Sequence, residues 1–365
     1  MRIAQVAPLY ESVPPRLYGG TERVVSYLTE ALVRMGHDVT LFASADSSTR
    51  AKLVPMRKIA MRLDAGCEDQ IAWHIIMVEK VAQMAAQFDV IHFHIDHLQL
   101  PVARRINTPT VTTLHGRLNM SDLQPLYREF SEVPVVSISD DQRRPLPFAN
   151  WQGTVHHGLP MNLYTPGGQR ERFLAFLGRV SPEKGLDVAI SIAQRAGWPI
   201  KIAAKIDPRD SEYYEHIKPM LTLPHVEFLG EVGEDGKLDL LRRAAGLLFP
   251  INWPEPFGLV MIEAMACGTP IIAYPRGSVP EVIDHGRTGF VVNNADEAVA
   301  AVPRLAELDT AEIRRTFERR FSAERMARDY VSIYKRLAGA MERELVPNRV
   351  PHRLEDGSGL AATTV

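Results

Sequence analysis

Cysteine is scarce in this chain: only Cys67 and Cys267 occur among 365 residues, too few for the disulfide framework of a small secreted protein. The chain also lacks an apolar run close to the roughly 18 residues that a transmembrane helix needs. Residues 2–8 read as a first strand rather than as a secretion signal. A formal net charge of −2 gives no electrostatic argument for a nucleic-acid partner. We therefore expect a cytoplasmic protein in a reducing compartment.

The remaining composition is that of an ordinary globular protein, with 45% apolar and 24% charged residues. At roughly 150 residues per domain, the length predicts two domains. Strand patterns alternate with helix patterns in both halves, on either side of a polar, Pro- and Gly-bearing stretch at residues 164–171. This alternation predicts two doubly wound α/β domains, with strands at residues 2–8, 38–43, 88–94, 110–115, 134–139, 173–177, 200–205, 225–232 and 271–274.

The most informative stretch is residues 254–268, Pro-Glu-Pro-Phe-Gly-Leu-Val-Met-Ile-Glu-Ala-Met-Ala-Cys-Gly. It predicts a loop, then an apolar helix that ends at Gly268. Glu263 stands among apolar neighbours on this helix, so its carboxylate needs a partner or a ligand. Glu255 precedes the helix, and both carboxylates can converge near the helix N-terminus, which suits a phosphate. The alternative is a buried Glu263 in an internal ion pair, preceded by a surface Glu255.

The two glutamates are separated by seven residues, in the setting Glu-Pro-Phe-Gly-Leu, and are followed by Gly-Thr-Pro at residues 268–270. This pattern resembles the signature of the retaining glycosyltransferases of family 4. The resemblance implies a GT-B fold, in which two Rossmann-like domains face each other across a cleft, and residues 154–160 resemble the last strand of the first domain. It also implies that Glu255 holds sugar hydroxyls, that Glu263 binds a nucleotide ribose diol, and that diphosphate and sugar meet the backbone amides of Phe257, Gly258 and Leu259.

A second phosphate-binding pattern occupies residues 178–185, between a predicted strand and a predicted helix. A short Gly/Arg/Lys loop before a helix N-terminus is a suitable cradle for a diphosphate. Arg179 and Lys184 supply positive charge where a leaving group gains negative charge; alternatively, both are ordinary surface cations. They fall on the two diphosphate-binding positions of the family, so the resemblance favours catalytic roles for both.

Two places in the first half are candidates. Gly19 and Gly20 follow the first strand in a Pro- and Gly-rich loop. The family resemblance implies that these glycines let the backbone approach the donor phosphate or the acceptor; the alternative is a surface loop. His115 closes a strand, and residues just past strand ends face the ligand crevice of a doubly wound sheet. The family places a histidine there against the donor sugar, so we expect His115 to be catalytic rather than merely structural.

Two strand ends in the second half complete the predicted donor site. Glu231 and Val232 end the 225–232 strand, which by resemblance lies under the nucleobase. Lys205 ends the 200–205 strand, where many relatives carry a glycine pair and this chain has Ala-Ala-Lys. We expect all three residues to contact the donor.

The cluster His92, His94, Asp96 and His97 supports a different hypothesis. His-x-His-x-Asp-His resembles the zinc-ligand signature of metallo-β-lactamase-like hydrolases, and alternate strand residues point to one face. However, that fold opens with antiparallel strands, whereas strands and helices alternate here. A zinc hydrolase therefore stays an alternative, beside a polar strand end that lines a cleft.

Residues 50–62 hold five cations and no acid. This stretch could contact anionic lipid, which would make the protein a peripheral membrane protein, or it could be a solvated loop face. The tail at residues 347–365 has little to bury, so we expect it to be disordered.

The sequence as a whole predicts an N-terminal acceptor-side domain (1–165), a C-terminal nucleotide-sugar domain (166–325), a helix that crosses back (326–344) and the tail (345–365). The predicted activity is metal-independent, retaining transfer of a sugar from a nucleotide diphosphate sugar to a hydroxyl of a sugar, lipid or small-molecule acceptor, without a cofactor. A nucleotide-sugar epimerase of the same fold and a catalytically silent nucleotide-binding module would also fit these motifs. The sequence predicts neither the donor, nor the acceptor, nor the oligomeric state.

Overall fold

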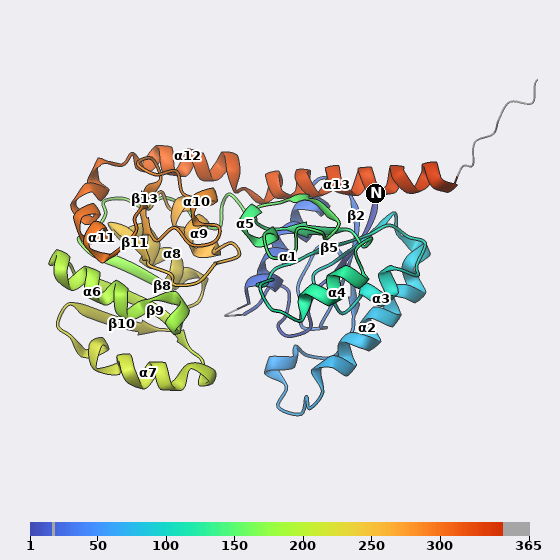
Figure 1. Ribbon diagram of the computed structural model, residues 1–365, viewed down its shortest axis with the longest axis horizontal. Helices are drawn as coiled ribbons and strands as arrows, with labels where there is room; N and C mark the ends of the chain where they lie inside the picture. Colours follow the sequence, from blue (N-terminus) through green and yellow to red (C-terminus); the bar gives the residue numbers. More distant parts are fainter. Residues whose placement is uncertain (17–18, 346–365) are drawn as a thin grey trace, which may run out of the picture.

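The structure is a computed structural model that describes residues 1–16 and 19–345, with side chains up to residue 340. Its strands form two separate sheets, and every strand pair within them is parallel. The first sheet has the order β3-β2-β1-β4-β5-β6-β7 and the second the order β10-β9-β8-β11-β12-β13. Figure 1 shows the two units side by side, each with its own helices. The predicted GT-B arrangement of two doubly wound units is confirmed.

The strands of the first sheet are β1 (Arg2–Val6), β2 (Asp38–Ala43), β3 (Lys52–Pro55), β4 (Val90–Phe93), β5 (Thr110–Thr113), β6 (Val135–Ser137) and β7 (Trp151–Thr154). Those of the second are β8 (Leu174–Val180), β9 (Ile200–Ile206), β10 (Val226–Gly230), β11 (Gly246–Phe249), β12 (Ile271–Ala273) and β13 (Gly289–Val291). In both sheets the strand order reverses direction beside the first strand of the unit, β1 or β8. Crevices at such reversal points are where doubly wound folds bind ligands.

The helices of the first unit are α1 (Gly20–Arg34), α2 (Gln70–Met84), α3 (Leu100–Ala103), α4 (Leu123–Glu129) and α5 (Asp140–Arg143). The later helices are α6 (Leu186–Ala196), α7 (Ser211–Ile217), α8 (Glu234–Arg243), α9 (Leu259–Ala266), α10 (Val279–Val282), α11 (Ala295–Ala301), α12 (Thr310–Arg320) and α13 (Ala323–Leu345). Short 3-10 turns lie at η1 (Met61–Leu63), η2 (Ala85–Gln87), η3 (Pro182–Lys184), η4 (Pro208–Asp210), η5 (Lys218–Thr222) and η6 (Val302–Glu307).

Helix α9 shows why the central stretch folds as the sequence predicts. Its residues from Met261 to Ala266 are all buried, so the helix is held by packing on every side. The helix ends at Ala266, and Gly268, two residues later, has φ +70, a left-handed conformation that glycine adopts without a Cβ clash. The amides of Gly268 and Thr269 then bond back to the carbonyls of Met265 and Ala264, at 2.9 and 2.8 Å. These bonds satisfy carbonyls that the helix end would otherwise leave unpaired.

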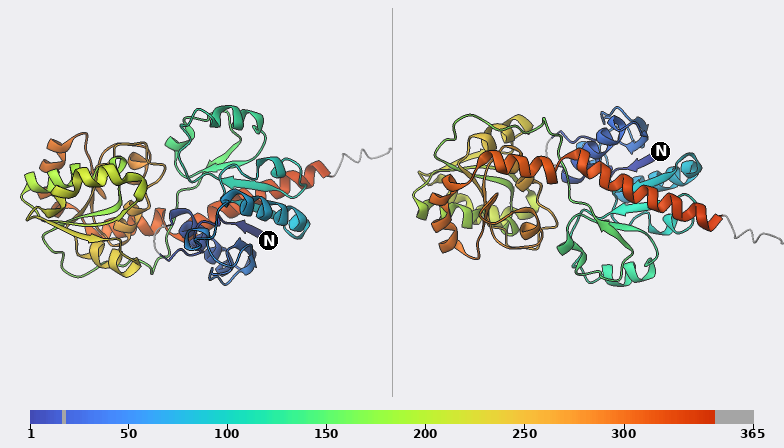
Figure 2. Two further views of the ribbon diagram at one scale, coloured as in Figure 1. Left: turned by 90° about the horizontal axis from the view of Figure 1, so that it is seen from below. Right: turned by 90° about the horizontal axis from the view of Figure 1, so that it is seen from above.

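Helix α13 belongs to the first unit in space, although it follows the second unit in sequence. It packs against α1 and β4. Figure 2 shows it running along the first unit, whereas α12, the helix before it, lies on the second unit. Its first turn is tied to α1 by the Arg34–Glu324 ion pair at 3.0 Å. Tyr330 and Tyr334, one turn apart, are almost fully buried. The helix therefore joins the two units and packs over the core of the first.

Three sequence-based predictions need correction. The last strand of the first sheet is β7, and not residues 154–160, which are a mostly irregular segment leading toward the second unit. Residues 52–55 form edge strand β3 instead of a loop, because Pro55 can end an edge strand without losing a ladder bond. Strand β8 continues to Val180, so Arg179 lies within a strand rather than in the loop after it. The predicted disordered tail lies outside the described residues.

Candidate active site

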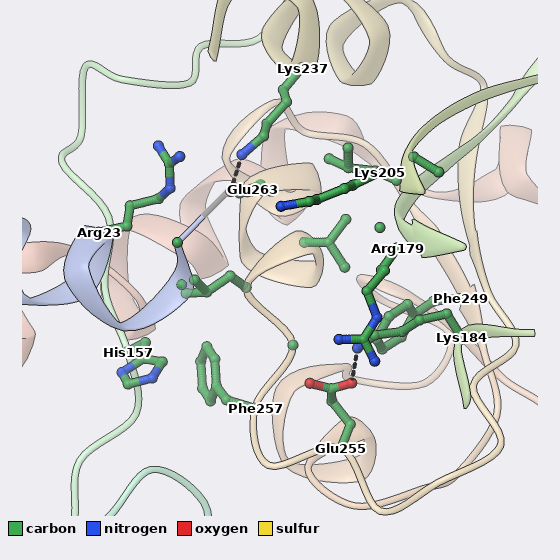
Figure 3. A pocket seen from close by; sticks show the side chains of 18 of the residues that line it. Arg23, His157, Arg179, Lys184, Lys205, Lys237, Phe249, Glu255, Phe257 and Glu263 are labelled. Carbon is green, nitrogen blue, oxygen red and sulfur yellow. Dashed lines mark hydrogen bonds and ion pairs between the residues drawn. The ribbon is translucent and has the colours of Figure 1, made fainter. Parts of the chain in front are cut away.

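A cavity of about 290 Å³ lies where the two units meet. Its lining comes from α1 and the end of β5 in the first unit, and from β8, β9 and α9 in the second. Every residue that the sequence nominated as catalytic or donor-binding lines this one cavity: Gly19, Gly20, His115, Arg179, Lys184, Lys205, Glu231, Val232, Glu255, Phe257, Gly258, Leu259 and Glu263. The structure thus brings the candidates together, and Figure 3 shows how several of them face one another.

Glu255 and Lys184 form an ion pair in the cavity wall, with Nζ and Oε2 2.5 Å apart. The indole N–H of Trp253 donates a second hydrogen bond to the same oxygen, at 2.9 Å. The backbone behind Glu255 is fixed by Gly277, where a Cβ would lie 2.2 Å from the Glu255 carbonyl oxygen. Only glycine permits this approach, so Gly277 sets the position from which Glu255 faces the cavity.

Glu263 is 4% exposed, and it has the partners that a buried carboxylate requires. The hydroxyl oxygen of Tyr164 lies 3.3 Å from Oε1, and Nζ of Lys237 lies 3.8 Å from the same oxygen. Tyr164 and Lys237 also bind Glu234, at 2.7 and 3.1 Å. Of the two alternatives that the sequence offered, the internal ion pair is therefore present. Glu263 also lines the cavity, so its role in binding a ligand stays a prediction.

Cations gather on two neighbouring strands of the second sheet. Arg179 on β8 and Lys205 on β9 are register partners, so both side chains leave the sheet at the same level. Arg179 is held by Asp210 at 3.1 Å and Glu183 at 3.3 Å. Together with Lys184 they place three positive charges beside the N-terminus of α9. Such a set favours a polyanionic ligand, because the helix dipole adds to the side-chain charges.

Two stacked histidines close the cavity on the side of the first unit. The rings of His115 and His157 are 5.3 Å apart and nearly parallel, and Phe257 meets His157 edge-on at 4.8 Å. Desolvation by the surrounding protein lowers the pKa of His115 to about 3, and lowers the pKa of His157 well below its ordinary value. Both imidazoles are therefore neutral near pH 7, which suits hydrogen bonding to hydroxyls better than binding of phosphate.

The first unit has a second cavity, of about 460 Å³, beside the first. The two share Gly19, Gly20, Thr21 and His115 as a common wall. Away from that wall, the second cavity is lined by residues of the first unit alone, among them Tyr10, Arg62 and Asp96. His115 thus lies at the junction between a space enclosed by both units and a space that belongs to one.

The geometry of His92 and His94 does not support the zinc hypothesis. Both ring nitrogens of His92 and of His94 are hydrogen-bonded to protein atoms, so none of them points at a shared metal position. Throughout the part of the chain that the structure describes, no three His, Cys, Asp or Glu side chains are grouped to hold a metal ion. The pattern reflects alternate residues at a buried strand end.

Several lining residues carried no recognisable pattern in the sequence. Arg23 reaches the cavity from α1 and pairs with Glu234 of α8, 211 positions away. Lys237 lines the cavity from α8, and His157 from the irregular segment after β7. Helix amphipathicity marks buried faces, but no local pattern indicates which polar residues of two distant helices meet.

The basic stretch at residues 50–62 is largely neutralised. Arg50 pairs with Glu30 at 2.9 Å, Arg57 with Asp64 at 2.6 Å, and Arg62 with Glu11 at 3.3 Å. Contact of this stretch with a membrane stays a prediction. In residues 1–16 and 19–345, no helix combines the length and apolarity needed to cross a bilayer.

Fold and site together define a glycosyltransferase of the GT-B class. A family model described as Glycosyltransferase Family 4 matches residues 18–133, and one described as Glycosyl transferases group 1 matches residues 167–321. The chain belongs to glycosyltransferase family 4.

Known relatives resemble the chain over nearly its whole length. The phosphatidyl-myo-inositol mannosyltransferase of Mycolicibacterium smegmatis is 27% identical, over 93% of this chain and 95% of the relative. The solved structure of AviGT4, a glycosyltransferase involved in avilamycin A biosynthesis, is 26% identical, with a TM-score of 0.71 over 93% of this chain and 98% of that one. Anabaena HepE in complex with UDP is 19% identical, with a TM-score of 0.68 over 94% and 100%, and this likeness shows the fold alone.

Proposed function

We propose that the protein transfers a sugar from a nucleotide diphosphate sugar to an acceptor hydroxyl, with retention of anomeric configuration and without a metal ion. The observation that carries this proposal is the convergence of Glu255, Lys184, Arg179 and Glu263 on one cavity at the N-terminus of α9. HepE, which shares the fold, is bound to UDP in its own solved structure; for this chain the nucleotide donor is part of the proposal. We take residues 166–325 as the donor side and residues 1–165 as the acceptor side.

The donor would lie with its ribose on Glu263 and its nucleobase near Glu231 and Val232, at the end of β10. A ribose diol offers two hydroxyl donors, and a carboxylate accepts both. The amides of Gly258 and Leu259 at the start of α9, with the cations of β8 and β9, would then face the diphosphate. This placement gives Glu263 and the cations Arg179, Lys184 and Lys205 each a ligand group of opposite or complementary character.

Lys184 and Arg179 are proposed to act on the leaving group. When the bond from the anomeric carbon to phosphate oxygen breaks, its electron pair stays on the phosphate, and negative charge there increases. Preorganised cations stabilise this charge more than they stabilise the intact donor, so they raise the rate. Because the cavity already supplies these cations and a helix N-terminus, the leaving diphosphate needs no metal ion to balance its charge.

Retention follows from attack on the same face that the leaving group vacates. The acceptor oxygen forms the new bond to the anomeric carbon, and its proton passes to the departing phosphate oxygen, which is the nearest strong base. Glu255 would orient sugar hydroxyls, a role that fits its fixed backbone and its pairing with Lys184. The second cavity, contiguous with the first at His115, is the proposed entrance for the acceptor.

A thermal-shift panel tests the proposal. UDP-glucose, GDP-mannose, ADP-glucose and the three free nucleoside diphosphates are each added to the full chain. A ligand at 100 times its Kd adds about 2.7 kcal/mol of stability, so at least one donor and its nucleoside diphosphate should raise the Tm. Turnover is then followed by chromatography. No stabilisation by any nucleotide contradicts the proposal, and release of an epimerised free sugar favours an epimerase of the same fold.

A further inference from the structure

The histidine pattern of β4, which the zinc hypothesis fails to explain, forms a buried hydrogen-bonded network behind the active site. Gln5, His92, His94 and Thr113 are all at most 2% exposed, and so are Tyr330 and Tyr334 of α13. His94 Nδ1 lies 2.9 Å from His115 Nε2, and His94 Nε2 lies 2.8 Å from Gln5 Oε1. The network therefore connects the C-terminal helix to a histidine that lines both cavities.

Gln5 determines the direction of the bonds that lead through His94 to His115. Its amide Nε2 donates to the Tyr334 hydroxyl at 3.1 Å, so its Oε1 is the acceptor that faces His94. His94 must then carry its proton on Nε2, and a neutral imidazole protonated there has a bare Nδ1. That bare nitrogen accepts from His115, which must carry its own proton on Nε2.

The other branch of the network agrees with this direction. The Tyr334 hydroxyl, having accepted from Gln5, donates its own proton to His92 Nδ1 at 2.6 Å. His92 Nε2 then donates to Thr113 Oγ1 at 2.7 Å, and Thr113 bonds to the Tyr330 hydroxyl at 2.8 Å. Each ring nitrogen of His92 and His94 has one partner of the opposite kind, so the network is complete without a charge.

We propose that Gln5, His94 and Tyr334 are positioning residues that fix His115 as the Nε2–H tautomer, so that its Nδ1 accepts a hydrogen bond from a substrate hydroxyl. This inference rests on the proposed function, since it assumes that a sugar occupies the cavity. No described residue forms a hydrogen bond to His115 Nδ1, and the ring lies at the junction of the two cavities.

The tautomer decides which ligand group His115 can bind. A bare Nδ1 attracts hydroxyl protons and repels phosphate oxygens, so the ring selects the sugar end of the donor or the hydroxyl of the acceptor. A free nucleoside diphosphate lacks both groups. Loss of the fixed tautomer should therefore lower turnover while the affinity for the nucleoside diphosphate stays the same, a split that general destabilisation does not produce.

The direct test is the nitrogen NMR spectrum of the ligand-free full chain labelled with ¹⁵N-histidine, in which His115 is identified by the signal missing from His115→Gln. We expect a protonated Nε2 and an unprotonated Nδ1 at pH 7.5 in the wild type. A proton on Nδ1 instead overturns the proposal. This readout needs no donor, so it decides whether the network fixes the tautomer even if the panel identifies no nucleotide sugar and the proposed function itself fails.

Two buried variants separate positioning from stability. Gln5→Met removes the anchor of His94, whereas Thr113→Val breaks the His92–Thr113 bond and leaves Gln5 and His94 in place. With the donor from the panel, Gln5→Met should mix the His115 tautomers and lower kcat for donor hydrolysis by about tenfold, the value of one lost hydrogen bond. Thr113→Val should lower the Tm but keep the tautomer, with kcat within about twofold. Equal loss of kcat in both variants, at equal nucleoside diphosphate affinity, would overturn the proposal.

Discussion

Replacement of Lys184 by alanine should affect turnover far more than binding. In the structure Lys184 Nζ lies 2.5 Å from Glu255 Oε2, and the two side chains are only 18% and 11% exposed. When the donor binds, the diphosphate competes with Glu255 for this ammonium group. Because the charge on the phosphate increases as the glycosidic bond breaks, the ammonium contributes most in the transition state.

The expected magnitude follows from this geometry. Loss of a preorganised charge partner at a developing anion lowers kcat about 100- to 1,000-fold, or about 2.7–4 kcal/mol. The folded state also loses the Lys184–Glu255 ion pair. Loss of a surface pair costs about 0.2–1 kcal/mol of stability, and breaking one side of a fully buried pair costs about 3–5 kcal/mol. This pair is partly exposed, so we expect a cost between the two. Glu255 keeps the Trp253 indole bond, so the protein should still fold.

The assay measures kcat from the rate of nucleoside diphosphate release and, separately, Kd by calorimetric titration of the donor. Lys184→Ala should lower kcat at least about tenfold more than it raises Kd. Arg179→Lys is the matched companion, because it keeps the charge but loses the paired guanidinium contacts to Asp210 and Glu183. This variant should retain little of the wild-type activity. If Lys184→Ala changes affinity alone, the cation merely anchors the anion, and catalysis must be sought at Glu255 and His115.

Four further outcomes are expected. Glu263→Ala should weaken donor and free nucleoside diphosphate alike, by about 1.5–3 kcal/mol in calorimetry; unchanged nucleotide affinity refutes the ribose assignment. Gly277→Ala, whose new methyl carbon would lie 2.2 Å from the Glu255 carbonyl oxygen, should lower both the Tm and kcat, and a normal Tm would show that this approach is not required. Addition of EDTA should leave turnover intact, and restoration of lost activity by a divalent metal would refute metal independence. The folded protein depresses the pKa values of four buried histidines, His92, His94, His115 and His157, so below about pH 6.5 the unfolded chain binds more protons than the folded one. Stability should therefore fall on acidification, by up to about 1.4 kcal/mol per pH unit for each histidine. A Tm that is higher at pH 5.5 than at pH 6.5 contradicts this.

The sequence predicted which residues of the second unit come together at the cavity, because local chemistry determines their positions. The apolar run of α9 and its closing Gly268 specify a buried helix, and a buried Glu263 needs a partner whatever the fold. Arg179 and Lys184 lie within six residues of each other, so strand and turn geometry brings them to one sheet edge. Positions that depend on a short stretch of chain can be inferred from that stretch.

Contacts between distant helices could not be predicted in this way. Arg23 of α1 and Lys237 of α8 both pair with Glu234 of α8. Only the docking of the two units brings Arg23 close to Glu234. The histidines of β4 misled for a related reason. Their spacing shows that His92 and His94 share a face of the strand, but Gln5 and Tyr334, which satisfy them, lie 87 and 242 positions away from His92 in sequence.

The most direct test of the central claim is a ¹H NMR time course of the full chain with the nucleotide sugar that the panel selects, recorded before the released sugar mutarotates. In the absence of an acceptor, water takes the place of the acceptor hydroxyl. The account predicts equimolar nucleoside diphosphate and a free sugar whose first-formed anomer has the configuration of the donor, and predicts that Lys184→Ala slows both. A first-formed sugar of inverted configuration, or release of a sugar phosphate with a nucleoside monophosphate, would contradict it.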